Sequence, residues 1–415
     1  MGTEQKGEWM PGKQPKSETS KTPPPNPLFE YDWILPGKTG TRQASLSIPA
    51  QGGVVSPANC AQASLGKVRS TNIKLIQPLK WPGGKHFLAK WIISFFPAHL
   101  HFVEPFCGGC AVLLARDPNR DWLLDEAWRL ENGDKLPAHL RGGSEIVNDV
   151  NGALTNFWKV LADEKMFSRF ERIMQAIPFS QDGWNQCNTL SRGAGASDPG
   201  LRASGEDLLT NAVWFFVRAR QSMAGRMNCF TPLTRNRTRG GRNAEANAWW
   251  NGIEGLPEVH ERLKGVVILN DDACNVIQQQ DGNRTLVYCD PPYLHTTRSS
   301  TGEYGEFEMS VFDHARLLML LSNPDRPMAL GRSMALGRRK ESWSDDQWSV
   351  LESYFSKKLK GKFILSGYPS ELYEIVSKAQ GWYRADIEID NKASSSKKKK
   401  KKIECLWANY KLEQE

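Results

Sequence analysis

The sequence of 415 residues lacks the long apolar runs that membrane proteins need. No stretch approaches the roughly 18–20 apolar residues of a membrane span, and residues 1–20 lack the apolar centre of a secretory signal. The eight cysteines are scattered, apart from Cys107 and Cys110, and this spacing disfavours a disulfide framework. These absences predict a reduced, cytoplasmic protein.

Acidic residues are absent from one region of the chain. Residues 211–242 hold seven arginines and no acid, and Lys397–Lys402 is a run of six lysines. The net charge is only +8, so the chain without these thirteen charges carries −5. Basic segments on an acidic body favour a polyanionic partner, although a lysine run is most often a solvated loop.

The apolar pattern alternates between strands and helices after residue 70. Residues 1–70 are rich in Pro, Gly and Ser, which predicts a disordered tail. Residues 179–205 and 231–248 are interpreted as loops. Alternating strands and helices predict an α/β fold with a parallel sheet, and two final strands without a helix between them predict an antiparallel hairpin at its edge. The predicted strands are 101–104, 145–147, 266–269, 285–289 and 363–366, followed by YRADIEI and IECLWANY.

The first candidate site is a glycine turn in FVEPFCGGCAV, residues 102–112. Gly108 and Gly109 permit a tight turn and a close approach of backbone to ligand, and the helix behind them favours a negative group. The turn does not have the GxGxxG spacing. Cys107 and Cys110 have no second pair to complete a zinc site. We interpret them as structural, with a redox pair as the alternative.

The second candidate site is YCDPPY, residues 288–293. Asp290 ends a predicted strand, and Pro291 and Pro292 stiffen the backbone and leave their carbonyls free to accept hydrogen bonds. A carboxylate and a rigid carbonyl can together accept both hydrogens of an exocyclic amine, while Tyr293 can stack on a flat ring. The alternative interpretation is an ordinary stiff turn at the end of a strand.

A series of motifs resembles the Dam-like N6-adenine DNA methyltransferases of the D12 class, α group, over about residues 73–412. Their order, with a glycine motif, a variable region and then DPPY, is that of the α group. The DPPY motif begins with Asp, which favours adenine as the target. The motifs are KWPGGK (80–85), FVEPFCGGCAV (102–112), NDVN (148–151), LNDDA (269–273), DPPY (290–293), FILSGY (363–368) and ECLW (404–407).

The resemblance implies methyl transfer from S-adenosylmethionine to the N6 amine of adenine in duplex DNA, after the base is flipped out. It implies a monomer of bacterial or phage origin that uses no metal, and it leaves a cognate restriction endonuclease open. The implied catalytic residues are Asp290, Pro291, Pro292 and Tyr293. The implied contacts to the methyl donor are Trp81, Lys85, Glu104, Phe106, Gly108, Gly109, Asp149, Asp272 and Asp290.

For two of these implied donor contacts, the sequence offers an alternative residue. Asp149 lies 40 residues after Gly109, whereas a ribose-binding acid normally follows a glycine turn by about 20 residues. Asp125 fits that spacing better, but NDVN matches the family's motif at Asp149. Asp271 competes with Asp272 for the adenine end of the donor.

The resemblance also implies a division into domains. Residues 1–70 form the tail, and residues 71–165 with 262–412 form a Rossmann-like class I S-adenosylmethionine-dependent methyltransferase domain. Residues 166–261 form a small, mainly helical target-recognition domain. Insertions are expected near 115–144 and 323–350, and the second contains a short repeat, MALGRS then MALGRR. The implied DNA contacts are Arg218, Arg226, Arg235, Arg237, Arg239 and Arg242, with a solvated basic loop as the alternative.

Two other functions remain as alternatives at this point. An enzyme of the same fold can act on another amine, such as cytosine N4, an RNA adenine or a protein amide. A DNA-binding relic disabled by its insertions is the third possibility, but the intact KWPGGK, NDVN and DPPY motifs disfavour it.

Overall fold

The computed structural model describes residues 75, 77–117, 143–193, 205–232, 238–239, 241–298, 302–336, 339–390 and 401–414. All of them belong to one unit, Lys67–Glu415. The predicted tail at 1–70, most of the predicted insertion at 115–144, and Asp125 lie outside the described residues.

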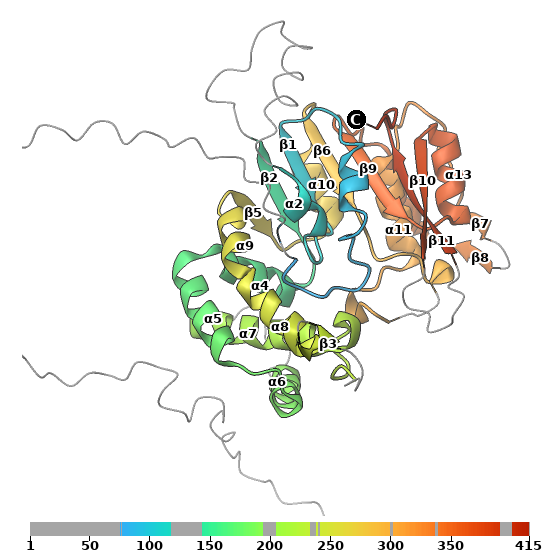
Figure 1. Ribbon diagram of the computed structural model, residues 1–415. Helices are drawn as coiled ribbons and strands as arrows, with labels where there is room; N and C mark the ends of the chain where they lie inside the picture. The colour runs from blue at the N-terminus through green and yellow to red at the C-terminus, as the bar shows by residue number, and fades with distance from the viewer. Residues whose placement is uncertain are drawn as a thin grey trace, which may run out of the picture. The chain divides into compact units, whose positions relative to one another are not determined.

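A seven-stranded sheet in the order β10-β11-β9-β6-β1-β2-β5 organises the described part of this unit (Figure 1). The strand β11 runs antiparallel to both of its neighbours, and the other pairs are parallel. The predicted α/β fold and terminal hairpin are confirmed. The strands are β1 (His101–Glu104), β2 (Ser144–Asn148), β5 (Val266–Leu269), β6 (Thr285–Cys289), β9 (Lys362–Gly367), β10 (Tyr383–Asp390) and β11 (Lys401–Ala408).

Helices cover both faces of this sheet, and its central strands therefore consist mainly of consecutive apolar residues. Every residue of β6 is buried. On one face, Val103 and Val287 belong to a core shared with the helices that follow β5, β6 and β9. On the other face, the Phe96 ring lies 5.6 Å from the Phe102 ring. The helices near the sheet are α1 (Ala89–Ile93), α2 (Ala111–Ala115), α10 (Ala273–Gln280), α11 (Val311–Leu321), α12 (Asp345–Phe355) and α13 (Glu371–Gln380).

A second group of helices lies between β2 and β5 in the sequence and is drawn green to yellow in Figure 1. Aromatic rings form its core: Phe157 stacks on Phe216 at 5.7 Å, and Phe216 lies 5.5 Å from Trp249. The helix α4 packs against α7 in this group, although the predicted domain boundary follows α4. The helices are α4 (Gly152–Ala162), α5 (Glu164–Ala176), α6 (Gln181–Gly193), α7 (Gly205–Gln221), α8 (Ala244–Glu254) and α9 (Leu256–Leu263).

Two loop predictions were wrong in part. The helix α6 lies within the predicted loop 179–205, where Trp184 and Cys187 are buried at helical spacing. The predicted loop 231–248 contains a small hairpin, β3 (Thr238–Arg239) with β4 (Arg242–Asn243), and the first turn of α8. Asn243 begins α8 because its side chain accepts hydrogen bonds from the first-turn amides.

The predicted insertion at 323–350 is ordered where it is described. Strands β7 (Ser333–Leu336) and β8 (Arg339–Ser342) pair as an antiparallel hairpin. The second copy of the repeat, residues 334–339, supplies three residues of β7 and the first residue of β8. Leu330, Trp343 and Trp348 pack into the core beside the sheet. Single-turn 3₁₀ helices occur at η3 (Met223–Gly225), η4 (His295–Thr297) and η5 (Gly305–Phe307). No helix among the described residues is both long and apolar enough to cross a membrane.

Candidate active site

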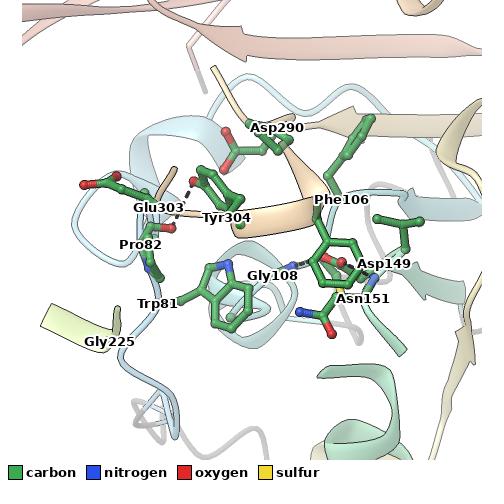
Figure 2. A pocket seen from close by; sticks show the side chains of 18 of the residues that line it. Trp81, Pro82, Phe106, Gly108, Asp149, Asn151, Gly225, Asp290, Glu303 and Tyr304 are labelled. Carbon is green, nitrogen blue, oxygen red and sulfur yellow. Dashed lines mark hydrogen bonds between the residues drawn. The ribbon is translucent and has the colours of Figure 1, made fainter. Parts of the chain in front are cut away.

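A cavity of about 370 Å³ lies at the carboxyl ends of β1, β2 and β6. Its volume is within the roughly 300–1,000 Å³ range of small-molecule sites, and the carboxyl edge is where open α/β sheets bind ligands. Glu104 ends β1. Asp149 and Asp290, which directly follow β2 and β6, both line the cavity (Figure 2). The lining residues predicted from sequence are Trp81, Lys85, Glu104, Phe106, Gly108, Gly109, Asp149, Asp290 and Pro292.

The glycine turn lies against the indole of Trp81 (Figure 2). Gly108 has a φ of +45°, and a Cβ there would lie 2.6 Å from Trp81 Nε1. The Gly108 carbonyl accepts a hydrogen bond of 3.1 Å from the indole of Trp158. Glycine is therefore required at position 108 both by the backbone conformation and by the neighbouring ring.

Asp149 is held by two backbone amides. Its Oδ2 accepts from Gly108 N at 3.1 Å, and its Oδ1 accepts from Asn151 N at 3.0 Å. Burial raises the pKa of Asp149 to about 6, although these two hydrogen bonds oppose the shift. The carboxylate thus lies in the cavity beside the glycine turn, ready to accept hydrogen bonds from a ligand's hydroxyl groups.

A lysine shared by two carboxylates lies at the DPPY end of the cavity. Lys85 Nζ is 2.7 Å from Asp290 Oδ1 and 3.7 Å from Glu404 Oε1. Burial lowers the pKa of Lys85, but Asp290 and Glu404 outweigh burial and the net pKa is raised. Burial raises the pKa of Asp290, and Lys85 partly opposes that change. Lys85 is therefore a charged ammonium at neutral pH.

Tyr293 lies beside this ion pair. Its hydroxyl donates a hydrogen bond to Glu404 Oε1, and its ring centroid is 4.7 Å from Lys85 Nζ. Tyr368 meets the same ring edge-on at 4.7 Å. The residues that line the cavity do not include Tyr293, Tyr368 or Pro291.

Asp272, a predicted donor contact, is not in the cavity lining. It caps α10 by accepting from Cys274 N at 2.9 Å, and its Oδ2 is 2.6 Å from an Arg316 guanidinium nitrogen. The amide and carbonyl of Asp271 both bond to the side chain of Asn148. Asp271 and Asp272 therefore both make hydrogen bonds that stabilise the start of α10.

The four predicted DNA-binding arginines that the structure describes lie on different elements. Arg226 lines the cavity and pairs with Glu303 at 2.7 Å. Arg242 on β4 is exposed, Arg218 on α7 is half-buried, and Arg239 lies in β3. Arg235 and Arg237 lie outside the described residues.

Several lining residues carry no sequence signal of their own. Tyr304 donates to the Pro82 carbonyl at 3.2 Å (Figure 2), and Gln77, beside the lining, donates to the Gly109 carbonyl at 3.0 Å. Gly225 has a φ of +76°, and a Cβ there would lie 2.0 Å from the Lys80 carbonyl oxygen. These residues lie in loops and in the single-turn helix η3, which only the tertiary fold brings together.

Cys107 and Cys110 are buried free thiols. Burial raises the pKa of both, so neither has the thiolate character of a redox cysteine. Among the described residues, no group of three or more His, Cys, Asp or Glu is arranged to hold a metal ion. The structural interpretation of the cysteine pair is therefore favoured.

The sheet, with its single inverted strand, is a Rossmann-like methyltransferase fold. The family model of the D12 class N6 adenine-specific DNA methyltransferases matches residues 81–132 and 136–360. The chain belongs to this family, and it is a DNA adenine N6-methyltransferase. A search of curated proteins found no match.

Proposed function

We propose that this protein transfers a methyl group from S-adenosylmethionine to the N6 amine of adenine at specific sites in duplex DNA, after flipping the base out. The observation that carries the proposal is that Asp290, at the end of β6, shares one cavity with the Gly108 turn and Asp149. A group that accepts from an amine thus lies beside groups suited to a nucleoside.

The lining of the cavity supports the proposed donor in two ways. The missing side chains at Gly108 and Gly109 let backbone approach the ligand, and Asp149 can accept from ribose hydroxyls. The described lining holds five carboxyl groups, Glu104, Asp149, Asp290, Glu303 and Glu306, against the cations Lys85 and Arg226. Burial raises the pKa of Glu104 well above its usual value, and the other four still outnumber the two cations. An excess of negative charge favours a cationic ligand, and S-adenosylmethionine supplies its methyl group on a positively charged sulfur.

The DPPY segment would hold the target amine. Asp290 and the Pro291 carbonyl accept the two N6 hydrogens, and this directs the nitrogen lone pair toward the methyl group. The ring of Tyr293 offers a stacking surface that offsets part of the few kcal/mol needed to unstack an adenine. Catalysis on this proposal comes from positioning and local electrostatics.

DNA would approach over the arginines of the helical group. Arg242 is exposed on the small hairpin, and Arg226 lies at the cavity itself. Arginines can pair with phosphates or read guanine edges. Asp271 or Asp272 as a contact to the donor's adenine stays a prediction that no contact in the structure supports.

Transfer of labelled methyl from S-adenosylmethionine to duplex DNA, RNA and protein, each offered separately, tests the proposal. We expect label in duplex DNA, in adenine, and sequencing of the methylated positions then identifies the recognition site. Label only in cytosine, RNA or protein would replace the proposed substrate. Donor binding without any transfer to DNA would contradict the proposal.

A further inference from the structure

Glu404 is a buried carboxylate that connects β11, the last strand in the sequence, to the proposed active site. It lies on β11, and its side chain is 2% exposed. It accepts a hydrogen bond from the Tyr293 hydroxyl and lies 3.7 Å from Lys85 Nζ. One side chain therefore contacts both the DPPY tyrosine and the lysine that faces Asp290.

The contact between Glu404 and Lys85 matters because Lys85 carries a buried charge. Lys85 Nζ is 2.7 Å from Asp290 Oδ1 and donates a hydrogen bond of 3.1 Å to the Gly83 carbonyl. The Lys85 side chain is only 7% exposed. A charge buried to this degree is costly unless it is paired. Lys85 therefore needs a carboxylate partner at every stage of the reaction.

Binding of the target amine adds a second donor to Asp290. In the proposed reaction Asp290 accepts a hydrogen bond from the amine as well as from Lys85, so the amine and the ammonium share one carboxylate. Glu404 is the second carboxylate next to Lys85, and it can keep the ammonium paired. The same carboxylate holds the hydroxyl of Tyr293, so the orientation of the ring depends on it as well.

We propose that Glu404 is a positioning residue for methyl transfer. It fixes the ring of Tyr293 and holds the Lys85 ammonium while Asp290 engages the target amine. The proposal rests on the roles proposed above for Asp290 and Tyr293. It predicts that the charge and the hydrogen bond of Glu404 contribute separately, because they act on different partners.

Three substitutions separate these contributions. Glu404→Gln removes the charge but keeps an oxygen that can accept from Tyr293, whereas Tyr293→Phe removes the hydrogen bond and keeps the charge. Glu388→Gln is the matched control, because Glu388 lies on the adjacent strand, is 62% exposed, and pairs with Lys401 outside the site. Thermal unfolding and donor affinity are measured on every variant.

We expect Glu404→Gln to lower kcat by about tenfold or more, on the scale that misplaced reacting groups cost. The Kd for S-adenosylmethionine is expected to stay within about twofold, because Glu404 is absent from the cavity lining. Glu388→Gln is expected to match wild type, and Glu404→Asp, which keeps the charge, to recover part of the lost rate.

The decisive comparison repeats Glu404→Gln in a Lys85→Met background. If Glu404 acts through Lys85, its substitution costs much less there, because the ammonium is already gone. An equal loss in both backgrounds shows a purely structural role and overturns the proposal, as does a Glu404→Gln variant as active as the Glu388→Gln control. If wild type itself methylates no DNA, the proposed function fails and the role of Glu404 fails with it.

Discussion

The backbone amide of Gly108 donates a hydrogen bond of 3.1 Å to Oδ2 of Asp149, across 41 residues of chain. This contact ties the turn after β1 to the carboxylate that follows β2. It forms because neighbouring parallel strands end at the same edge of the sheet. The glycine turn and the carboxylate that we propose to bind the donor thereby position one another.

Asp149→Asn is expected to weaken binding of S-adenosylmethionine and to remove its pH dependence. Burial raises the pKa of Asp149 to about 6, and the ionised carboxylate is the better acceptor for ribose hydroxyls. Wild-type affinity should therefore rise about tenfold per pH unit below pH 6 and level off above it. Calorimetric titration between pH 5 and 8 measures this, and a flat wild-type profile would show that Asp149 does not bind the donor as an anion.

The same carboxyl makes stability depend on pH in a predictable direction. Its ordinary pKa is 3.8, and its folded pKa is about 6, so the folded state binds the proton more tightly. The resulting stabilisation is complete below about pH 4 and is lost as the pH rises through about 6. We expect the free energy of unfolding of Asp149→Asn, relative to wild type, to increase over this interval. Urea titrations at several pH values test the sign, and a decrease would contradict it.

Gly108→Ala is expected to abolish donor binding, whereas Gly241→Ala is not. Both glycines have positive φ, but a Cβ at Gly108 meets Trp81 Nε1 at 2.6 Å and a Cβ at Gly241 meets nothing within 4 Å. Both substitutions should cost about 1–2 kcal/mol of stability for the backbone conformation. Only Gly108→Ala must also displace an indole that lines the cavity. Equal donor affinity in the two variants would show that the Trp81 contact does not shape the site.

Much of the catalytic sheet could be predicted because short segments determine it. The strand β6 is buried at every position, so TLVYC is mainly apolar, and Asp290 directly follows it. The glycine turn also follows from local chemistry, since Gly108 needs a positive φ. These features depend on neighbours in the sequence, and the pattern therefore reveals them.

The contacts that complete the site could not be predicted in the same way. Tyr304 reaches the site from an irregular loop that contains no motif. Glu404 begins the ECLW motif on β11, but the motif alone does not reveal the contacts of Glu404 with Tyr293 and Lys85. Asp272 is different, because an aspartate directly before a helix is a recognised N-cap signal. That signal could have identified its bonds to the start of α10. The helix α6 was missed because its Gly, Ser and Asn content conceals the buried Trp184.

Asp290→Ala is expected to lower methyl transfer by at least about 100-fold, the scale of losing a preorganised polar group. Thermal unfolding should change little, because Lys85 keeps Glu404 as a charged partner. Donor affinity should fall much less than transfer, because Asp290 is only one of several carboxyl groups in the lining. Single-turnover transfer to duplex DNA, measured with donor binding and circular dichroism, separates these effects. Full activity in the variant would show that Asp290 is not catalytic.

Arg242→Ala is expected to weaken DNA binding and to make it less sensitive to salt. Arg242 is exposed on the β3–β4 hairpin, and each phosphate contact contributes about 0.9 to the slope of log K against log salt. Arg332→Ala removes the same charge from the 323–350 segment, where the side chain is 64% exposed. If the helical group binds DNA, the slope falls by about 0.9 for Arg242→Ala and stays at the wild-type value for Arg332→Ala. A wild-type slope for Arg242→Ala would instead mean that the hairpin arginine is a solvated charge.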